Sequence, residues 1–261
     1  MRVGLKAIPL PEEGSPARLE VESKRSGGQG QRDRGVLTER NYQCFVGAVN
    51  FIATVRPDIA FAINWLARYS SCPIQEAIQA GKWLLRYLKS TQELKHTFRG
   101  GKGALTLTAW SDSDWANDEE TAVSVTGSAF LLAGAAVNWV SQKQKCVATS
   151  SSEAEYIAAS ETAREVVWLR VLLAGIGEAQ PESTPLFMDN TTSIRFVKED
   201  AVTPRRKHIN VKYHYVREQF REGLLAPVWI ETKQQLADLL TKALPAEAFT
   251  RFRNAIMGIR D

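Results

Sequence analysis

Acidic residues gather in the stretch WSDSDWAND, residues 110–118, which places three aspartates within nine positions of a chain with a net charge of +4. The residues before it alternate between apolar and polar side chains, a pattern typical of a β-strand. Asp112 therefore stands at the end of a predicted strand. Asp189 ends a second one, PLFM over residues 185–188. Side chains at the ends of neighbouring strands can converge at one edge of a sheet.

Two more carboxylates belong to predicted helices. Glu155 falls in the first turns of a long helix, four residues before Ala159 and so on the inward side. Asp238 lies in the helix that follows the last predicted strand. For any single acid, a solvated turn or a helix cap is the simpler interpretation. That interpretation weakens when all four acids occupy such positions.

Four clustered carboxylates would repel one another unless cations lay among them. A site rich in oxygen and free of histidine suits Mg²⁺, with Mn²⁺ as the alternative. Two such ions about 4 Å apart can activate a water and stabilise the leaving oxygen in phosphodiester cleavage. The sequence therefore suggests metal-dependent phosphodiester chemistry.

The elements that would position these acids form an α/β pattern after a glycine-rich break at residues 100–103. The order is β-β-β-α-β-α-α-β-α, which predicts one mixed sheet covered by helices. The predicted strands cover residues 105–111, 127–132, 136–140, 185–188 and 226–231. The predicted helices cover residues 150–173, 189–199, 209–222 and 234–243. Ser150 and Glu153 fit a capping box at the start of the long helix, and Gly175 is predicted to end it.

The preceding part of the chain reads differently. Residues 41–100 carry apolar side chains at helical spacing in three segments, which predicts a small helical unit. Residues 1–40 are rich in Gly, Arg, Ser, Glu and Gln, and we expect a disordered leader or a truncated end there. Residues 246–261 are expected to form a C-terminal helix or tail.

Composition sets broad limits. The 261 residues are 44% hydrophobic and suffice for one large domain or two small ones. The basic pI of about 9.0 is compatible with a polyanionic partner. The three cysteines form no paired motif, so we expect buried, reduced thiols and no zinc site. The seven tryptophans are expected mostly in the core, although Trp115 beside the acids could contact a substrate. No window is apolar enough for a membrane span, and no signal peptide is recognised.

Six blocks, in order, resemble the C-terminal part of a copia-type retrotransposon Pol polyprotein. They are YQCFVGAVNFIATVRPDIAFA (42–62), SDSDWA (111–116), SSEAEY (151–156), MDN (188–190), RKHINVKYH (206–214) and LADLLTK (236–242). The resemblance implies a connection-like helical end of a reverse transcriptase at 41–100. It also implies a ribonuclease H-like domain at 104–245, with a five-stranded mixed sheet flanked by helices.

By this resemblance, four acids fill the catalytic and metal-binding positions of a ribonuclease H, which are Asp112, Glu155, Asp189 and Asp238. Asp114 and Glu153 are neighbours rather than expected ligands. The implied cofactor is two Mg²⁺ ions, with Mn²⁺ as the alternative. The implied substrate is an RNA–DNA hybrid, and the rest of the reverse transcriptase is a further expected partner. The chain contains no Asp-Asp pair, so the polymerase site is absent.

The densest basic stretch has two open interpretations. Arg205, Arg206, Lys207, His208 and Lys212, with His214 and Arg217 beyond them, could hold nucleic-acid phosphates. A solvated helix face explains the same residues equally well.

Three functions stay open from the sequence. The favoured one is a metal-dependent endonuclease that cuts the RNA strand of RNA–DNA hybrids, located in the cytoplasm (in a virus-like particle) or the nucleus and not secreted. The second is a catalytically inactive element remnant that acts as a nucleic-acid-binding or structural module. The third is a DNA transposase or integrase, which typically uses two Asp and a later Glu, whereas the Glu here is second of four.

Overall fold

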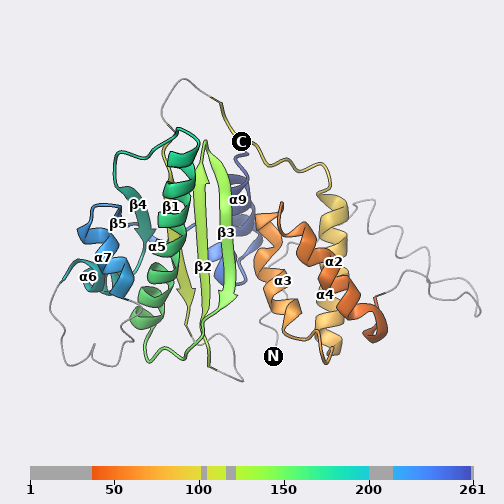
Figure 1. Ribbon diagram of the computed structural model, residues 1–261. Helices are drawn as coiled ribbons and strands as arrows, with labels where there is room; N and C mark the ends of the chain where they lie inside the picture. Colours follow the sequence, from red (N-terminus) through yellow and green to blue (C-terminus); the bar gives the residue numbers. More distant parts are fainter. Residues whose placement is uncertain (1–36, 101–104, 116–121, 200–213, 260–261) are drawn as a thin grey trace, which may run out of the picture. The chain divides into compact units, whose positions relative to one another are not determined.

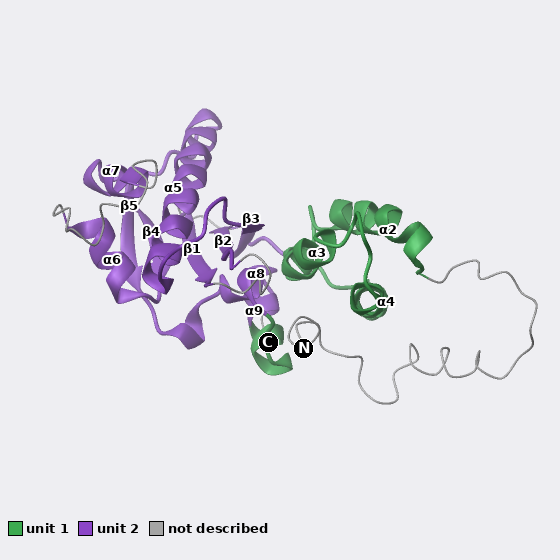
Figure 2. Ribbon diagram, turned by 90° about the horizontal axis from the view of Figure 1, so that it is seen from below, with its two compact units in different colours: residues 1–95, 243–251 green, residues 96–242, 252–261 purple. Residues whose placement is uncertain are grey.

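The computed structural model describes residues 37–100, 105–115, 122–199 and 214–259 (Figure 1). The chain divides into two compact units, coloured separately in Figure 2. Unit 1 contains the chain up to residue 95 together with residues 243–251, and unit 2 contains residues 96–242 and 252–261. The domain limits drawn from the sequence stay a prediction. Among the described helices, none is both long and apolar enough to cross a membrane.

Unit 1 is helical, as the periodicity predicts. Its elements are α2 (Glu39–Ile52), the 3₁₀ turn η1 (Pro57–Ile59), α3 (Ala60–Ala67) and α4 (Gln75–Ser90). Their apolar stripes meet in a core that includes Tyr42, Val49, Leu66 and Leu84, all at most 2% exposed. The Tyr42 hydroxyl donates to the Leu66 carbonyl at 2.8 Å, so the polar end of this buried ring is satisfied.

A buried ionic network fixes η1 against α4. The Arg56 guanidinium donates to both carboxylate oxygens of Asp58, at 2.8 and 2.7 Å. It also donates to the carbonyl of Thr91, and the Tyr87 hydroxyl donates to Asp58 at 2.5 Å. Arg56 and Asp58 are 8% and 3% exposed, so each charge depends on its partner.

Unit 2 contains a five-stranded mixed sheet in the order β3-β2-β1-β4-β5. The strands are β1 (Thr108–Asp114), β2 (Val125–Leu132), β3 (Ala135–Lys143), β4 (Thr184–Met188) and β5 (Leu225–Trp229). β1, β4 and β5 are parallel, and β2 is antiparallel to both β1 and β3. This confirms the predicted architecture, a mixed sheet of five strands flanked by helices and preceded by a helical unit.

Helices cover this sheet (Figure 1). They are α5 (Ser151–Gly175), α6 (Thr191–Lys198), α7 (Tyr215–Arg221), the 3₁₀ turn η4 (Thr232–Gln234) and α8 (Asp238–Thr241). The core joins apolar residues of β1, β4 and β5 to those of α5, α6 and α7, and the predicted inward stripe of α5 lies in it. α9 (Ala246–Ile256) spans the division between the units, which falls after residue 251.

Several local expectations are wrong. β1 lies three residues later than predicted, so Asp112 is inside the strand rather than at its end. The single helix predicted for 234–243 is instead η4 followed by α8. α5 does run to Gly175, but Gly177 supplies the positive φ (87°) beyond its end. Positive φ favours glycine because it has no Cβ.

Two predictions about burial also fail. Cys44 and Cys72 are exposed and Cys146 is only partly buried, so the predicted burial of the three thiols is wrong. None of the seven tryptophans is fully buried, and Trp115, Trp168 and Trp229 are about half exposed. Tryptophan is large and has a polar N–H, so it is often only partly covered.

Candidate active site

The parallel pairing of β1 with β4 brings Asp112 and Asp189 together. Trp110 is paired with Phe187 in the ladder, and the two aspartates lie two residues beyond these partners. Asp189 directly follows the last residue of β4, and its carbonyl accepts a hydrogen bond from the Trp229 indole at 3.2 Å. The end of β5 therefore helps to hold the end of β4 in place.

Glu155 reaches this edge from the start of α5. The Ser150 side chain caps the helix by accepting from the Glu153 N–H at 3.2 Å, which is one half of the predicted capping box. Glu153 turns away and accepts from the backbone N–H of Thr149 at 2.7 Å. Glu155 lies one turn into the helix, and the Ser113 backbone partly opposes the rise in the pKa of its carboxyl. Glu153 therefore helps to hold the start of the helix, whereas Glu155 lies in the group of acids.

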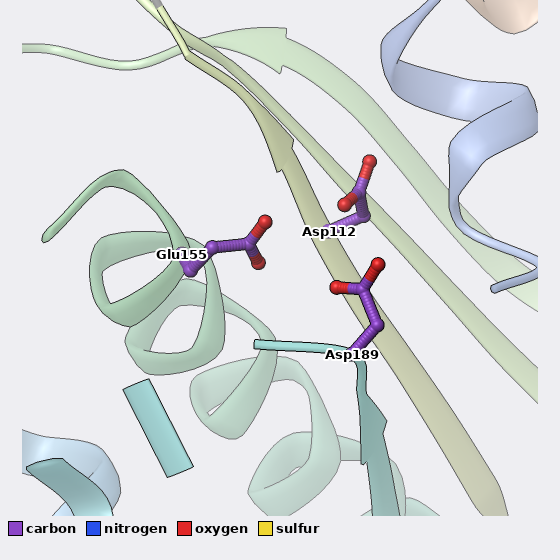
Figure 3. A group of neighbouring side chains, drawn as sticks. All are labelled: Asp112, Glu155 and Asp189. Carbon is purple, nitrogen blue, oxygen red and sulfur yellow. The ribbon is translucent and has the colours of Figure 1, made fainter. Parts of the chain in front are cut away.

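Asp112, Glu155 and Asp189 point toward one another (Figure 3). Each offers a carboxylate oxygen, and these three oxygens all lie within 4.8 Å of one another. Asp112 and Glu155 are 2% and 6% exposed. The Glu155 Oε2 atom is buried and has no hydrogen-bond partner among the described residues. Burying a carboxylate oxygen that receives no hydrogen bond costs free energy unless a cation binds to that oxygen.

The electrostatics of Glu155 fit a cation site. Burial raises the pKa of the Glu155 carboxyl well above its ordinary value, and the nearby Asp112 and Asp189 raise it further. The donor set consists of carboxylate oxygens alone, which is the preference of Mg²⁺ and Mn²⁺. These residues therefore fit a hard divalent cation.

Asp238 lies on another side of Asp112, outside that group of three. It begins α8, is 5% exposed, and pairs with the Lys242 ammonium at 2.8 Å. Burial raises the pKa of Asp238 to about 8, and repulsion from Asp112 adds to this while Lys242 opposes it. Asp112 thus lies close to the three other predicted acids, but only Asp112, Glu155 and Asp189 form one compact group of carboxylates.

Sequence reasoning missed Thr241 and Lys242. The Thr241 hydroxyl donates to Asp112 Oδ2 at 2.5 Å, and the Lys242 ammonium lies 3.7 Å from the same oxygen. The i, i+4 spacing of Asp238 and Lys242 in LADLLTK could have revealed the ion pair. Nothing in the sequence indicates that Thr241 reaches Asp112, which lies 129 positions away.

The aromatic neighbours of the site are held by their indole N–H groups. Trp115 donates to the Ala148 carbonyl at 3.1 Å and is 50% exposed, and Trp229 is 54% exposed. The sequence singled out Trp115 but not Trp229. Both leave part of an aromatic ring open to solvent beside the acids.

The predicted nucleic-acid contacts Arg205, Arg206, Lys207, His208 and Lys212 lie outside the described residues. The two basic residues that follow them have structural partners. His214 Nδ1 lies 3.0 Å from the Tyr156 hydroxyl. Arg217 is 6% exposed and donates to the Phe196 carbonyl. A phosphate-binding role for Arg217 is therefore wrong, because its guanidinium is buried between α6 and α7.

No protein-family model matches the chain. The Retrovirus-related Pol polyprotein from transposon RE1 of Arabidopsis thaliana is 37% identical over 215 residues, which is 82% of this chain and 15% of that protein. The corresponding polyprotein from transposon TNT 1-94 of Nicotiana tabacum is 37% identical over 218 residues, 83% of this chain and 16% of that protein. The chain thus spans about a sixth of the length of these relatives.

Among solved structures, the N-terminal RNase H domain of rv2228c from Mycobacterium tuberculosis is similar with a TM-score of 0.38 and 13% identity. The match covers 57% of this chain and 96% of that one. The sequence relatives are what assign the family. The chain belongs to the copia-type retrotransposon Pol polyproteins, of which it represents one segment.

Proposed function

We propose that this chain is a metal-dependent ribonuclease H that hydrolyses the RNA strand of RNA–DNA hybrids. The observation that carries the proposal is the convergence of Asp112, Glu155 and Asp189, with one buried Glu155 oxygen to which no described residue donates a hydrogen bond. Kinship with retrotransposon Pol polyproteins supports a substrate that arises during reverse transcription. In this reading the chain joins the end of a reverse transcriptase to its ribonuclease H.

Each residue of the site has its own role in this proposal. Asp112, Glu155 and Asp189 hold a divalent cation, for which Mg²⁺ is the proposed ion. When bound, the ion supplies Lewis-acid activation of a water and neutralises charge on the scissile phosphate. Thr241 fixes the Asp112 carboxylate by donating to Oδ2. The Lys242 ammonium lies 2.8 Å from Asp238 and holds that side chain beside Asp112.

Substrate binding is assigned to residues around this edge. The half-exposed rings of Trp115 and Trp229 are positioned for apolar contact with sugars or bases. Arg205, Arg206, Lys207, His208 and Lys212 are the proposed phosphate contacts. Recognition of a hybrid would depend on 2′-hydroxyl and phosphate contacts along the minor groove. The proposed location is the cytoplasm, in a virus-like particle, or the nucleus.

The deciding experiment is cleavage of an end-labelled RNA–DNA hybrid by the purified chain, with Mg²⁺ or with EDTA. We expect cleavage of the RNA strand only with the metal, leaving 3′-hydroxyl and 5′-phosphate ends. Asp112→Asn and Glu155→Gln should each lower the rate by about 100-fold or more, because each removes a charge that positions the ion.

Glu178→Gln is the matched control, since it removes one carboxylate from an exposed position beyond α5. It should cleave at the parent rate, and melting curves should confirm that every variant is folded. Full activity in Asp112→Asn would contradict the assignment. A folded parent that never cleaves hybrid would favour the inactive-remnant alternative.

A further inference from the structure

Lys242 is a positive charge built into the acidic cluster. It follows the last residue of α8, and its ammonium lies 2.8 Å from Asp238 Oδ1 and 3.7 Å from Asp112 Oδ2. The side chain is 32% exposed while both carboxylates are almost fully buried. The ammonium therefore enters the site from its solvent side and faces two acids at once.

Close packing of α8 on β2 sets this position. Gly127 of β2 is the ladder partner of Asp112. A Cβ placed on Gly127 would lie 2.5 Å from the Thr241 methyl group and 2.8 Å from the Ala237 carbonyl. Only glycine leaves room for α8 at this distance from the strand. The same approach lets Thr241 donate to Asp112 and places the next residue, Lys242, beside it.

The charges around Asp112 then fall into two sets. On one side stand Glu155 and Asp189, for which the described residues supply no ion-pair partner within 4 Å. On the other side stands Asp238, which is paired with Lys242. A lysine side chain that contacts two carboxylates carries a positive charge at neutral pH.

We infer that Lys242 takes the place of a second divalent ion in this cluster. Asp112, Glu155 and Asp189 then bind one ion, and the Lys242 ammonium supplies the other positive charge, between Asp112 and Asp238. This departs from the two ions that the sequence resemblance implies. This inference rests on the proposed function because it concerns the same site. It is tested separately, because it predicts how many divalent cations the protein binds in the absence of nucleic acid.

The test counts Mn²⁺ ions bound to the full chain without nucleic acid, by calorimetry and by the electron paramagnetic resonance signal of free Mn²⁺. We expect the parent to bind one ion per chain at this site. Lys242→Met should bind two, because removal of the ammonium leaves Asp112 and Asp238 as an uncompensated pair. Lys242→Arg should bind one, since it keeps the charge.

Lys233→Met is the control for a lost positive charge, because Lys233 forms an exposed ion pair with Glu231 outside the cluster. It should bind Mn²⁺ like the parent. Two ions on the parent, or only one on a folded Lys242→Met chain, would overturn the inference. A parent that binds one ion but cleaves no hybrid would sink the proposed function and leave this inference standing.

Discussion

At the scale of single residues, the site is defined by carboxyl groups that are held away from water. Burial raises the pKa of both Glu155 and Asp238, the latter to about 8. Between about pH 4 and pH 8 the folded chain therefore keeps protons that the unfolded chain releases. Stability of the metal-free protein must then fall as pH rises through that window, by the linkage between proton binding and folding.

Asp238→Asn should flatten this dependence. Without metal, the parent should lose a few kcal/mol of stability between pH 5 and pH 8.5, and the variant should lose less. Denaturant unfolding in EDTA at several pH values measures both slopes. Glu178→Gln, which alters an exposed acid, should follow the parent. Identical slopes in Asp238→Asn and the parent would show that Asp238 titrates normally.

At the scale of elements, the turn between β2 and β3 has an unusual backbone conformation. Ala133 and Gly134 join β2 to β3 with φ values of 53° and 82°. Positive φ at both central residues is the signature of a type I′ hairpin, whose twist matches that of the strands. Alanine is poorly suited to this conformation because its Cβ crowds the backbone there.

Ala133→Asn should therefore stabilise the sheet unit. The change creates Asn-Gly, the preferred pair for this turn, and should raise the free energy of unfolding by about 0.5–1 kcal/mol. Thermal or denaturant unfolding measures the gain. Ala133→Val is the opposing variant, and it should be destabilising because a β-branched side chain tolerates positive φ least. Equal stability of all three chains would refute the argument.

At the scale of the whole molecule, each of the two units has its own interior. Unit 1 depends on a buried ion pair, Arg56 with Asp58, as well as on apolar packing. Unit 2 has an apolar core between its sheet and α5, α6 and α7. The two interiors make it possible to weaken one unit without touching the residues of the acidic cluster.

Asp58→Asn should destabilise unit 1 by about 3–5 kcal/mol, because it leaves the buried Arg56 charge without its partner. Hydrogen exchange should show lost protection in α2, α3 and α4, while β1 and β2 keep theirs. Glu76→Gln removes an exposed acid from the first turn of α4 and should change little. Unchanged protection in Asp58→Asn would mean that the network contributes no net stability.

The sequence by itself determined most of the elements of the sheet unit and named the acids of the candidate site. Alternation, helical spacing and capping residues predict the five strands, α5 and α6 to within about three residues, because these signals act locally. The six Pol-like blocks identify the four acids. Boundaries failed where tertiary contacts override local preference, as in β1, and where η4 and α8 replace one predicted helix.

Only the tertiary structure decided which of the four acids lie together. Asp112, Glu155 and Asp189 converge because parallel pairing of β1 with β4 and the capped start of α5 meet at one edge. Asp238 and Lys242 lie beside Asp112 because Gly127 lets α8 pack closely against β2. The burial that raises the pKa of Glu155 likewise comes from the assembled sheet and helices. Distances between residues far apart in the chain depend on packing, and no local pattern encodes them.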